Sequence, residues 1–77
     1  MSEREATRVR NRIRDRRYQA GEMTQQALAD SVGVTRQTIN AIEQGKYSPT
    51  LEAAFRISRS LGVALEELFY YDDGTAN

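Results

Sequence analysis

Residues 24–46, TQQALADSVGVTRQTINAIEQGK, determine how this chain folds. Apolar residues recur three or four positions apart in both halves of the stretch, which predicts two short amphipathic helices. Gly33 lies between them, where glycine takes the left-handed conformation of a helix C-cap without a steric cost. Thr24 and Thr35 each precede a predicted helix, and a threonine hydroxyl can accept a hydrogen bond from an unpaired amide of the first turn. We therefore expect two helices joined by one tight turn.

The second of these helices, over about 36–44, has a polar face made of long hydrogen-bonding side chains. Ile39 and Ile42 form its buried side. On the other side, arginine can bond guanine O6 and N7, glutamine and asparagine can bond adenine, and alanine can touch the methyl group of thymine. Such an arrangement is a helix-turn-helix, whose second helix commonly lies in the major groove of DNA. We predict that four residues read bases: Arg36, Gln37, Asn40 and Ala41.

An ordinary solvated helix surface is the alternative interpretation of this polar face. Charged and polar residues cover the outer side of most helices, so polarity alone indicates little. Two threonine caps and two glycines stand in register around the helices, however, and this combination favours the helix-turn-helix.

The flanking sequence predicts three further helices. The first is expected over about 7–20, with Val9, Ile13 and Ala20 facing the core. Thr50 can cap a helix that runs to Leu61, and a last short helix is expected over about 65–69. We thus predict an all-α, compact five-helix fold with the helix-turn-helix at its second and third helices. The aromatic run after the last helix allows a short C-terminal strand, because successive side chains of an extended segment point to opposite faces.

The charge of the chain is distributed unevenly along the sequence. The formal net charge is zero, but residues 8–46 hold eight basic and four acidic side chains, whereas residues 47–77 hold two basic and five acidic ones. A basic half and an acidic half would orient the domain on a nucleic acid. The arginines of the first helix are spread around it, and the faces that carry Arg10 with Arg14, or Arg12 with Arg16, are candidates for phosphate contacts.

Composition excludes several classes of protein. The chain has no cysteine and no histidine, so a disulfide frame, a thiolate metal site and the usual general base are all absent. We therefore expect no enzyme activity, no metal and no cofactor. No apolar run approaches the roughly 20 residues that span a membrane, and the N-terminus lacks the apolar region of a signal peptide. A cytoplasmic protein with no membrane partner is predicted.

Three segments, NRIRDRR, MTQQALADSVGVTRQTINAIEQGKYSPTLEAAFRISRSLGV and LEELF, together resemble the lambda-repressor-like (Xre/Cro) helix-turn-helix family, over about 11–71. The chain looks most like the short prokaryotic regulators of that family, which consist of little more than the DNA-binding domain. From the residues we expect a domain over 7–71, with flexible ends at 1–6 and 72–77. The resemblance implies double-stranded DNA as partner, bound by a homodimer at a palindromic operator. We expect the protein to regulate transcription, most simply as a repressor.

The resemblance assigns roles to individual residues. Arg17 and Glu43 match a pair that often forms an internal ion pair, so both are expected to be structural. The matched positions for phosphate or backbone contact are Gln25, Thr38, Gln44, Lys46 and Tyr47. In related short regulators the fifth helix and the following segment form the dimer contact. We expect the same here of Leu65, Leu68, Phe69, Tyr70 and Tyr71, although these aromatics can alternatively cover the core of their own protomer.

The sequence leaves other functions of the same fold open. One is the antitoxin of a toxin, or another module that binds a protein partner, although little chain lies beyond the domain to wrap a toxin. Another is the controller protein of a restriction-modification system. The sequence does not separate these alternatives from a generic regulator.

Overall fold

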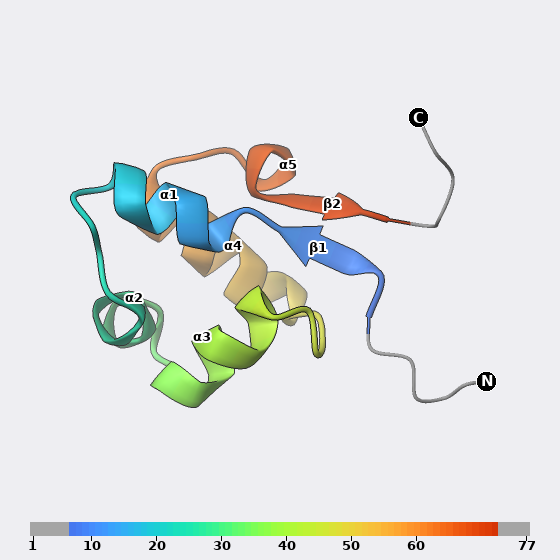
Figure 1. Cartoon of the computed structure of the whole chain (residues 1–77), viewed down its shortest axis with the longest axis horizontal. Helices are drawn as coiled ribbons and strands as arrows, with labels where there is room; N and C mark the ends of the chain where they lie inside the picture. Colours follow the sequence, from blue (N-terminus) through green and yellow to red (C-terminus); the bar gives the residue numbers. More distant parts are fainter. Residues whose placement is uncertain (1–6, 73–77) are drawn as a thin grey trace.

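Threonine caps begin the three longest helices of the chain. The computed structural model describes residues 7–72, which contain five helices and two short strands (Figure 1). Helices α2 (Gln25–Val32), α3 (Arg36–Glu43) and α4 (Leu51–Leu61) each follow a threonine. The hydroxyl oxygens of these threonines accept from the amide three residues later, at 3.0, 3.1 and 3.1 Å respectively. The predicted caps are therefore confirmed.

Gly33 makes the turn between α2 and α3. Its φ of 89° lies in the left-handed region, where a side chain would be strained. Its amide and that of Val34 both donate to the Ala29 carbonyl, at 2.8 and 3.0 Å, and so close the end of α2. The chain then enters α3 directly, and the helix-turn-helix is formed as predicted.

The apolar core lies where the helices meet. Its buried side chains come from every helix of the fold and include the predicted pair Ile39 and Ile42. The other members of the cluster are Ile13, Leu28, Ala29, Val32, Ile57, Leu61 and Leu68. Because both apolar residues of α3 are directed into this core, the opposite side of that helix is turned outward.

The N-terminal segment differs from the prediction. The prediction of a first helix over about 7–20 was wrong. Helix α1 is limited to Ile13–Gln19, and strand β1 (Val9–Asn11) precedes it. The strand pairs in antiparallel fashion with β2 (Phe69–Tyr71), which follows directly on α5 (Leu65–Leu68). The two strands lie side by side at the end of the molecule away from the α1–α2 turn (Figure 1). Local sequence did not reveal this pairing, because its partner lies about 60 residues away in the sequence.

Two expected core residues are also displaced by the shorter helix. Ala20 is the C-cap of α1 and is exposed, and Val9 is only half-buried on the strand. Tyr18, on the same short helix, is 52% exposed. Ile13 alone of the predicted N-terminal set is fully buried.

Asn11 joins the strand to two helices. Its Oδ1 accepts from the Ile13 amide at 3.1 Å, which pairs one of the amides at the start of α1. Its Nδ2 donates to the Ile42 carbonyl at 2.8 Å, near the end of α3. A side chain at the edge of a short sheet thereby holds the C-terminal turn of the outward-facing helix.

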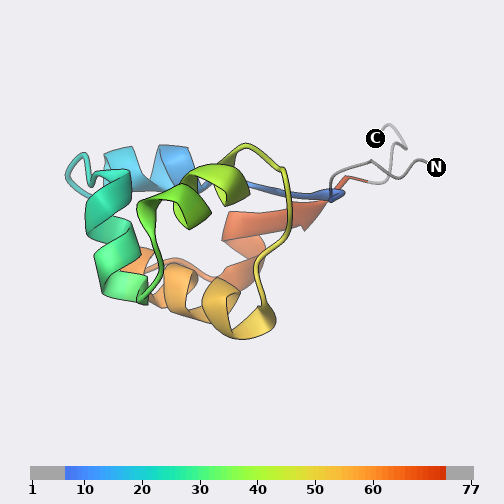
Figure 2. The same cartoon turned by 90° about the horizontal axis from the view of Figure 1, so that it is seen from below.

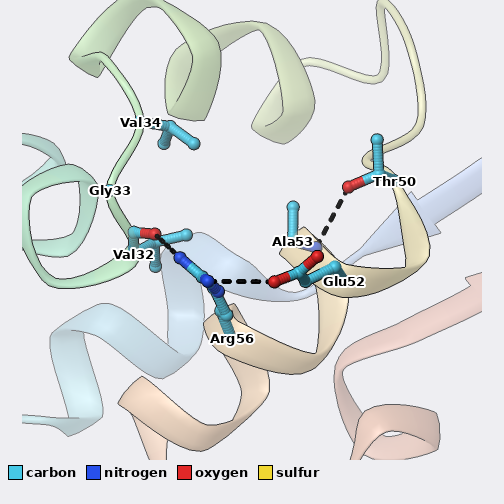
Figure 3. A pocket seen from close by; sticks show the side chains of 7 residues that line it. All are labelled: Val32, Gly33, Val34, Thr50, Glu52, Ala53 and Arg56. Carbon is cyan, nitrogen blue, oxygen red and sulfur yellow. Dashed lines mark hydrogen bonds and ion pairs between the residues drawn. The ribbon is translucent and has the colours of Figure 1, made fainter.

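Arg56 connects α4 to the turn of the helix-turn-helix. It lies in a pocket lined by residues 32–34 and the first turns of α4 (Figure 3). Its Nη1 donates to the Val32 carbonyl at 3.2 Å, and its Nη2 pairs with Glu52 at 2.9 Å. The exposed ion pair with Glu52 contributes little on its own. The bond to Val32 satisfies a carbonyl at the end of α2 and fixes the turn against α4.

Asn11→Ala should lower the free energy of unfolding by about 1–3 kcal/mol, because it removes two partly buried hydrogen bonds and leaves the Ile42 carbonyl without its partner. Urea denaturation measures the change. Gln19→Ala is the matched control, since it removes one exposed side-chain bond on α1. A loss for Asn11→Ala no larger than that of the control would contradict the structural role of Asn11.

Candidate nucleic-acid interface

The polar side of α3 lies on the outside of the molecule. The helix forms its lower edge in Figure 1 and faces the viewer in Figure 2, where α1 and α2 lie beside it. Arg36 and Gln37 are exposed in the first turn, and Asn40 and Ala41 are half-buried one turn later. The four predicted base-reading residues are thus placed together on one accessible helix face.

A buried ion pair fixes α3 to α1. Arg17 Nε donates to Glu43 Oε2 at 2.7 Å, and Arg17 Nη2 donates to Glu43 Oε1 at 3.1 Å. Arg17 Nη1 donates to the Met23 carbonyl at 2.7 Å, in the connection between α1 and α2. Arg17 is only 6% exposed, so its charge is satisfied within the protein. The expected pair is present as a bidentate contact that joins α1, α3 and the segment before α2.

Polar side chains extend from this ion pair onto the surface of α3. Gln25, the first residue of α2, donates from Nε2 to Glu43 Oε1 at 3.1 Å and to Asn40 Oδ1 at 3.2 Å. Gln44 Nε2 also donates to Asn40 Oδ1, at 3.3 Å. These side chains line a polar pocket beside α3, and Arg14 lines it as well. Two residues expected at phosphate, Gln25 and Gln44, are therefore bonded to a residue expected at bases.

The loop after α3 carries the remaining predicted phosphate contacts. Lys46 and Tyr47 are exposed, and the Lys46 amide donates to the Ala41 carbonyl at 3.0 Å, which closes the helix. Gly45 has a φ of 74°, and a Cβ at this position would lie 3.4 Å from Arg10 Nη1. The turn therefore uses glycine for its left-handed backbone, and the Arg10 guanidinium lies within van der Waals reach of it.

Sequence reasoning misplaced the N-terminal arginines. Arg10 lies on β1 and reaches the end of α3, so it does not share a helical face with Arg14. Arg12 precedes α1, and its guanidinium stacks on the Tyr70 ring at 4.3 Å from the centroid. Arg16 donates to the Gln19 side chain on the exposed surface of α1. Arg10 and Arg14, predicted to share a face of the first helix, both lie beside α3, but Arg10 reaches it from β1 and Arg14 from α1.

Thr38 has a local role in the structure. Its amide donates to the Thr35 hydroxyl at 3.1 Å, and the two hydroxyl oxygens lie 3.0 Å apart. Its position in the first turn of α3 remains compatible with a nearby DNA backbone. The predicted phosphate contact of Thr38 stays a prediction.

The C-terminal aromatics fall into two environments. Leu68 is completely buried in the core, so it cannot contact a partner subunit. The prediction that Leu68 belongs to the dimer contact was therefore wrong. Phe69 packs partly against the same core, whereas Tyr70 and Tyr71 are 43% and 66% exposed. Leu65 and Phe69 line an apolar groove between the two-stranded sheet and α4, whose other lining residues are Val9, Ser48, Pro49, Leu51 and Ala54.

The described part of the chain shows neither a membrane-spanning helix nor a cluster of metal ligands. Between residues 7 and 72, no helix has the length and apolar character to cross a lipid bilayer. In the same range, no three or more acidic side chains gather as a metal site would require. The hydrogen-bonding groups that converge on one surface are those around α3.

Comparisons with known proteins give matches over most of the chain. The family model described as helix-turn-helix matches residues 13–68. A Methanothermobacter thermautotrophicus protein is 49% identical over 69 residues, covering 88% of this chain and 99% of that protein. A Methanocaldococcus jannaschii protein is 53% identical over 51 residues, covering 66% of this chain and 77% of that protein. Bacillus subtilis YgzD is 35% identical over 65 residues, covering 84% and 97%. All three are named HTH-type transcriptional regulators and are themselves uncharacterized.

A solved structure agrees with the fold. The crystal structure of a proposed DNA-binding protein from Bacteroides fragilis superposes with a TM-score of 0.72 at 24% sequence identity. The superposition covers 80% of this chain and 98% of that one. At this identity the likeness establishes a common fold.

Arg17→Met should lower the free energy of unfolding by about 3–5 kcal/mol, because it leaves the carboxylate of Glu43 buried without its cation. Thermal denaturation followed by circular dichroism measures the loss. Arg16→Met, on the exposed side of the same helix, is the control and should change stability by less than about 0.5 kcal/mol. Equal effects of the two substitutions would show that the ion pair does not hold α3 in place.

Proposed function

Because this chain belongs to the lambda-repressor-like helix-turn-helix family, we propose that it is a sequence-specific DNA-binding regulator of transcription that binds a palindromic operator as a homodimer. One observation carries the proposal. Arg36, Gln37, Asn40 and Ala41 stand on one outward face of α3, while Ile39 and Ile42 fix the opposite face in the core. A helix held in this way presents side chains that match the edges of base pairs.

Groups that suit phosphate flank the proposed base-reading face. Gln25 lies at the N-terminus of α2, and Lys46 and Tyr47 lie in the loop after α3. Arg10 and Arg14 add positive charge beside the same helix. Contacts to phosphate supply much of the affinity and set the register of a protein on the duplex, whereas contacts to base edges supply specificity.

The homodimer is proposed to form through the apolar groove between the sheet and α4. Leu51 is 67% exposed at its edge, and Leu65 and Phe69 line it. Val9 and Tyr71 are paired across the sheet, which places the exposed Tyr71 ring on the face that carries Val9 and the groove. We propose that a second copy of the chain fills this groove, because a two-fold symmetric operator binds two copies. The two half-sites would lie about one turn of DNA, roughly 34 Å, apart.

Repression by occlusion of a promoter is the simplest mechanism, because it requires only that the protein bind DNA. A dimer bound across a promoter would exclude polymerase without further contacts, and its occupancy would follow protein concentration. This function places the protein with the DNA of a prokaryotic cytoplasm. It uses no cofactor and no catalytic group.

Selection from a random duplex library at near-physiological salt tests the proposed function. The purified protein should enrich a palindrome whose half-sites are centred about one helical turn apart. Weak, salt-sensitive binding with no enriched sequence would contradict the proposal and would direct attention to a protein partner.

Arg36→Ala should weaken binding to the enriched duplex by about 1–3 kcal/mol and relax the preference at one base pair. Lys46→Ala should instead weaken binding to all sequences alike and make it less sensitive to salt, because it removes a phosphate contact. Fluorescence anisotropy with cognate and scrambled duplexes at several salt concentrations separates the two effects. If Arg36→Ala weakened both duplexes equally, its assigned role in base reading would be wrong.

Leu51→Lys should convert a dimer into a monomer, because it places a charge at the edge of the proposed contact while replacing a side chain that is exposed in the protomer. Analytical ultracentrifugation over a range of concentrations measures the mass. Tyr18→Ala, which removes an exposed aromatic ring on α1, should leave the dimer unchanged. A dimer that persists in Leu51→Lys would place the interface elsewhere.

A further inference from the structure

Asn40 makes its hydrogen bonds within the protein through one end of its carboxamide. Its Oδ1 accepts from Gln25 Nε2 at 3.2 Å and from Gln44 Nε2 at 3.3 Å. A carboxamide has an acceptor oxygen at one end and an NH₂ group with two donors at the other. Among the contacts within residues 7–72, the Asn40 NH₂ group has no hydrogen bond, and the side chain is half-buried on the outward face of α3. The donor end is therefore the one available to a ligand.

The chemistry of the neighbouring side chains explains this orientation. Either end of an Asn or Gln carboxamide can occupy the same space, so the surrounding donors and acceptors must select one. Arg17 can only donate, and the Glu43 carboxylate can only accept. Gln25 must therefore turn its NH₂ group toward Glu43 Oε1, which lies 3.1 Å away. The same nitrogen reaches Asn40, which must meet it with oxygen.

Burial fixes the Arg17–Glu43 ion pair, from which this series of hydrogen bonds begins. The side chains of Arg17 and Glu43 are 8% and 9% exposed, so water does not readily replace either partner. Both oxygens of Glu43 accept from Arg17, and Oε1 accepts from Gln25 as well. A fixed acceptor therefore lies at the base of the polar pocket beside α3.

We propose that the Arg17–Glu43 ion pair, acting through Gln25, sets the hydrogen-bonding polarity of Asn40, so that α3 presents Asn40 to the major groove as a donor only. This inference rests on the proposed function. Guanine offers two acceptors in the groove, N7 and O6, and thymine offers O4, whereas cytosine offers the N4 donor. Asn40 therefore selects guanine or thymine over cytosine. It does not form the paired N6 and N7 contact with adenine that a freely turning asparagine makes.

Gln25 and Glu43 are positioning residues in this scheme, because they act on the base through Asn40. A purely structural role would change affinity for every sequence in the same proportion. The proposed role changes the relative preference at the base pair that Asn40 contacts. Relative preference at one position is therefore the readout that distinguishes the two.

The test is selection from a random duplex library with the wild type and three variants. Asn40→Ala identifies the base pair whose preference depends on Asn40. At that pair the wild type should favour guanine or thymine over cytosine by about fivefold or more, the order expected for directed groove hydrogen bonds. Gln25→Ala should reduce this ratio to less than about twofold, because the remaining partner of Asn40 is Gln44, which is exposed and can present either end of its own carboxamide, so that Asn40 can turn its oxygen outward. It should also lower overall affinity if Gln25 contacts phosphate.

Gln26→Ala is the matched control. Gln26 is the next residue of α2, and its Nε2 donates to Asp30 Oδ1 at 2.8 Å on the exposed surface. This variant should keep the wild-type ratio at the Asn40 base pair. Thermal denaturation of each variant confirms that it is folded at the temperature of the selection.

Each result has one meaning for the proposal. If the wild type enriches no sequence, the proposed function itself fails. If the wild type enriches a sequence but Asn40→Ala alters no position, Asn40 does not read a base and the inference is overturned. Preference for cytosine at the mapped pair, or an unchanged ratio in Gln25→Ala, overturns it as well while leaving the regulator intact.

Discussion

The buried ion pair between Arg17 and Glu43 is the constraint on which the candidate site depends. Two charges with little access to water must each find their partners within the fold, and here the bidentate contact and the Met23 carbonyl supply them. Such a pair adds little stability compared with apolar side chains of similar volume, but removing either partner is costly. Its effect is therefore geometric: α1, α3 and the start of α2 satisfy the charges only in the arrangement that turns the polar side of α3 outward.

The remaining contacts of α3 act in the same direction. Ile39 and Ile42 hold its inner side in the core, and Asn11 holds its last turn from the two-stranded sheet. At its beginning, the Gly33 turn is fixed against α4 by the bond from Arg56 to the Val32 carbonyl. A recognition helix must keep its position to within a fraction of an ångström to discriminate between base edges. The small domain meets this requirement by attaching both ends and one face of α3 to other elements.

The helix-turn-helix itself was predictable from sequence because its signals are local. Thr24, Thr35 and Gly33 act within three or four residues of their own positions, and the apolar spacing marks the core side of each helix. The N-terminal segment was not predictable in this way. Helix over 7–12 suited the local sequence, but pairing with Phe69–Tyr71 and the two bonds of Asn11 favour a strand there. Leu68 was misassigned to an interface for a related reason: its spacing marks an apolar position without showing which surface covers it. The hydrogen bond from Gln25 to Asn40 was not predictable from local sequence either, because it joins two helices.

The central claim is that the outward face of α3, with the groups beside it, is the DNA-binding surface. Nuclear magnetic resonance of ¹⁵N-labelled protein titrated with an enriched duplex tests it most directly. The largest shifts should fall on residues 36–47 and on the side-chain amides of Gln25 and Asn40. Only small changes are expected on the outer surface of α4. Shifts concentrated on α4 and the two-stranded sheet, with α3 unaffected, would contradict it.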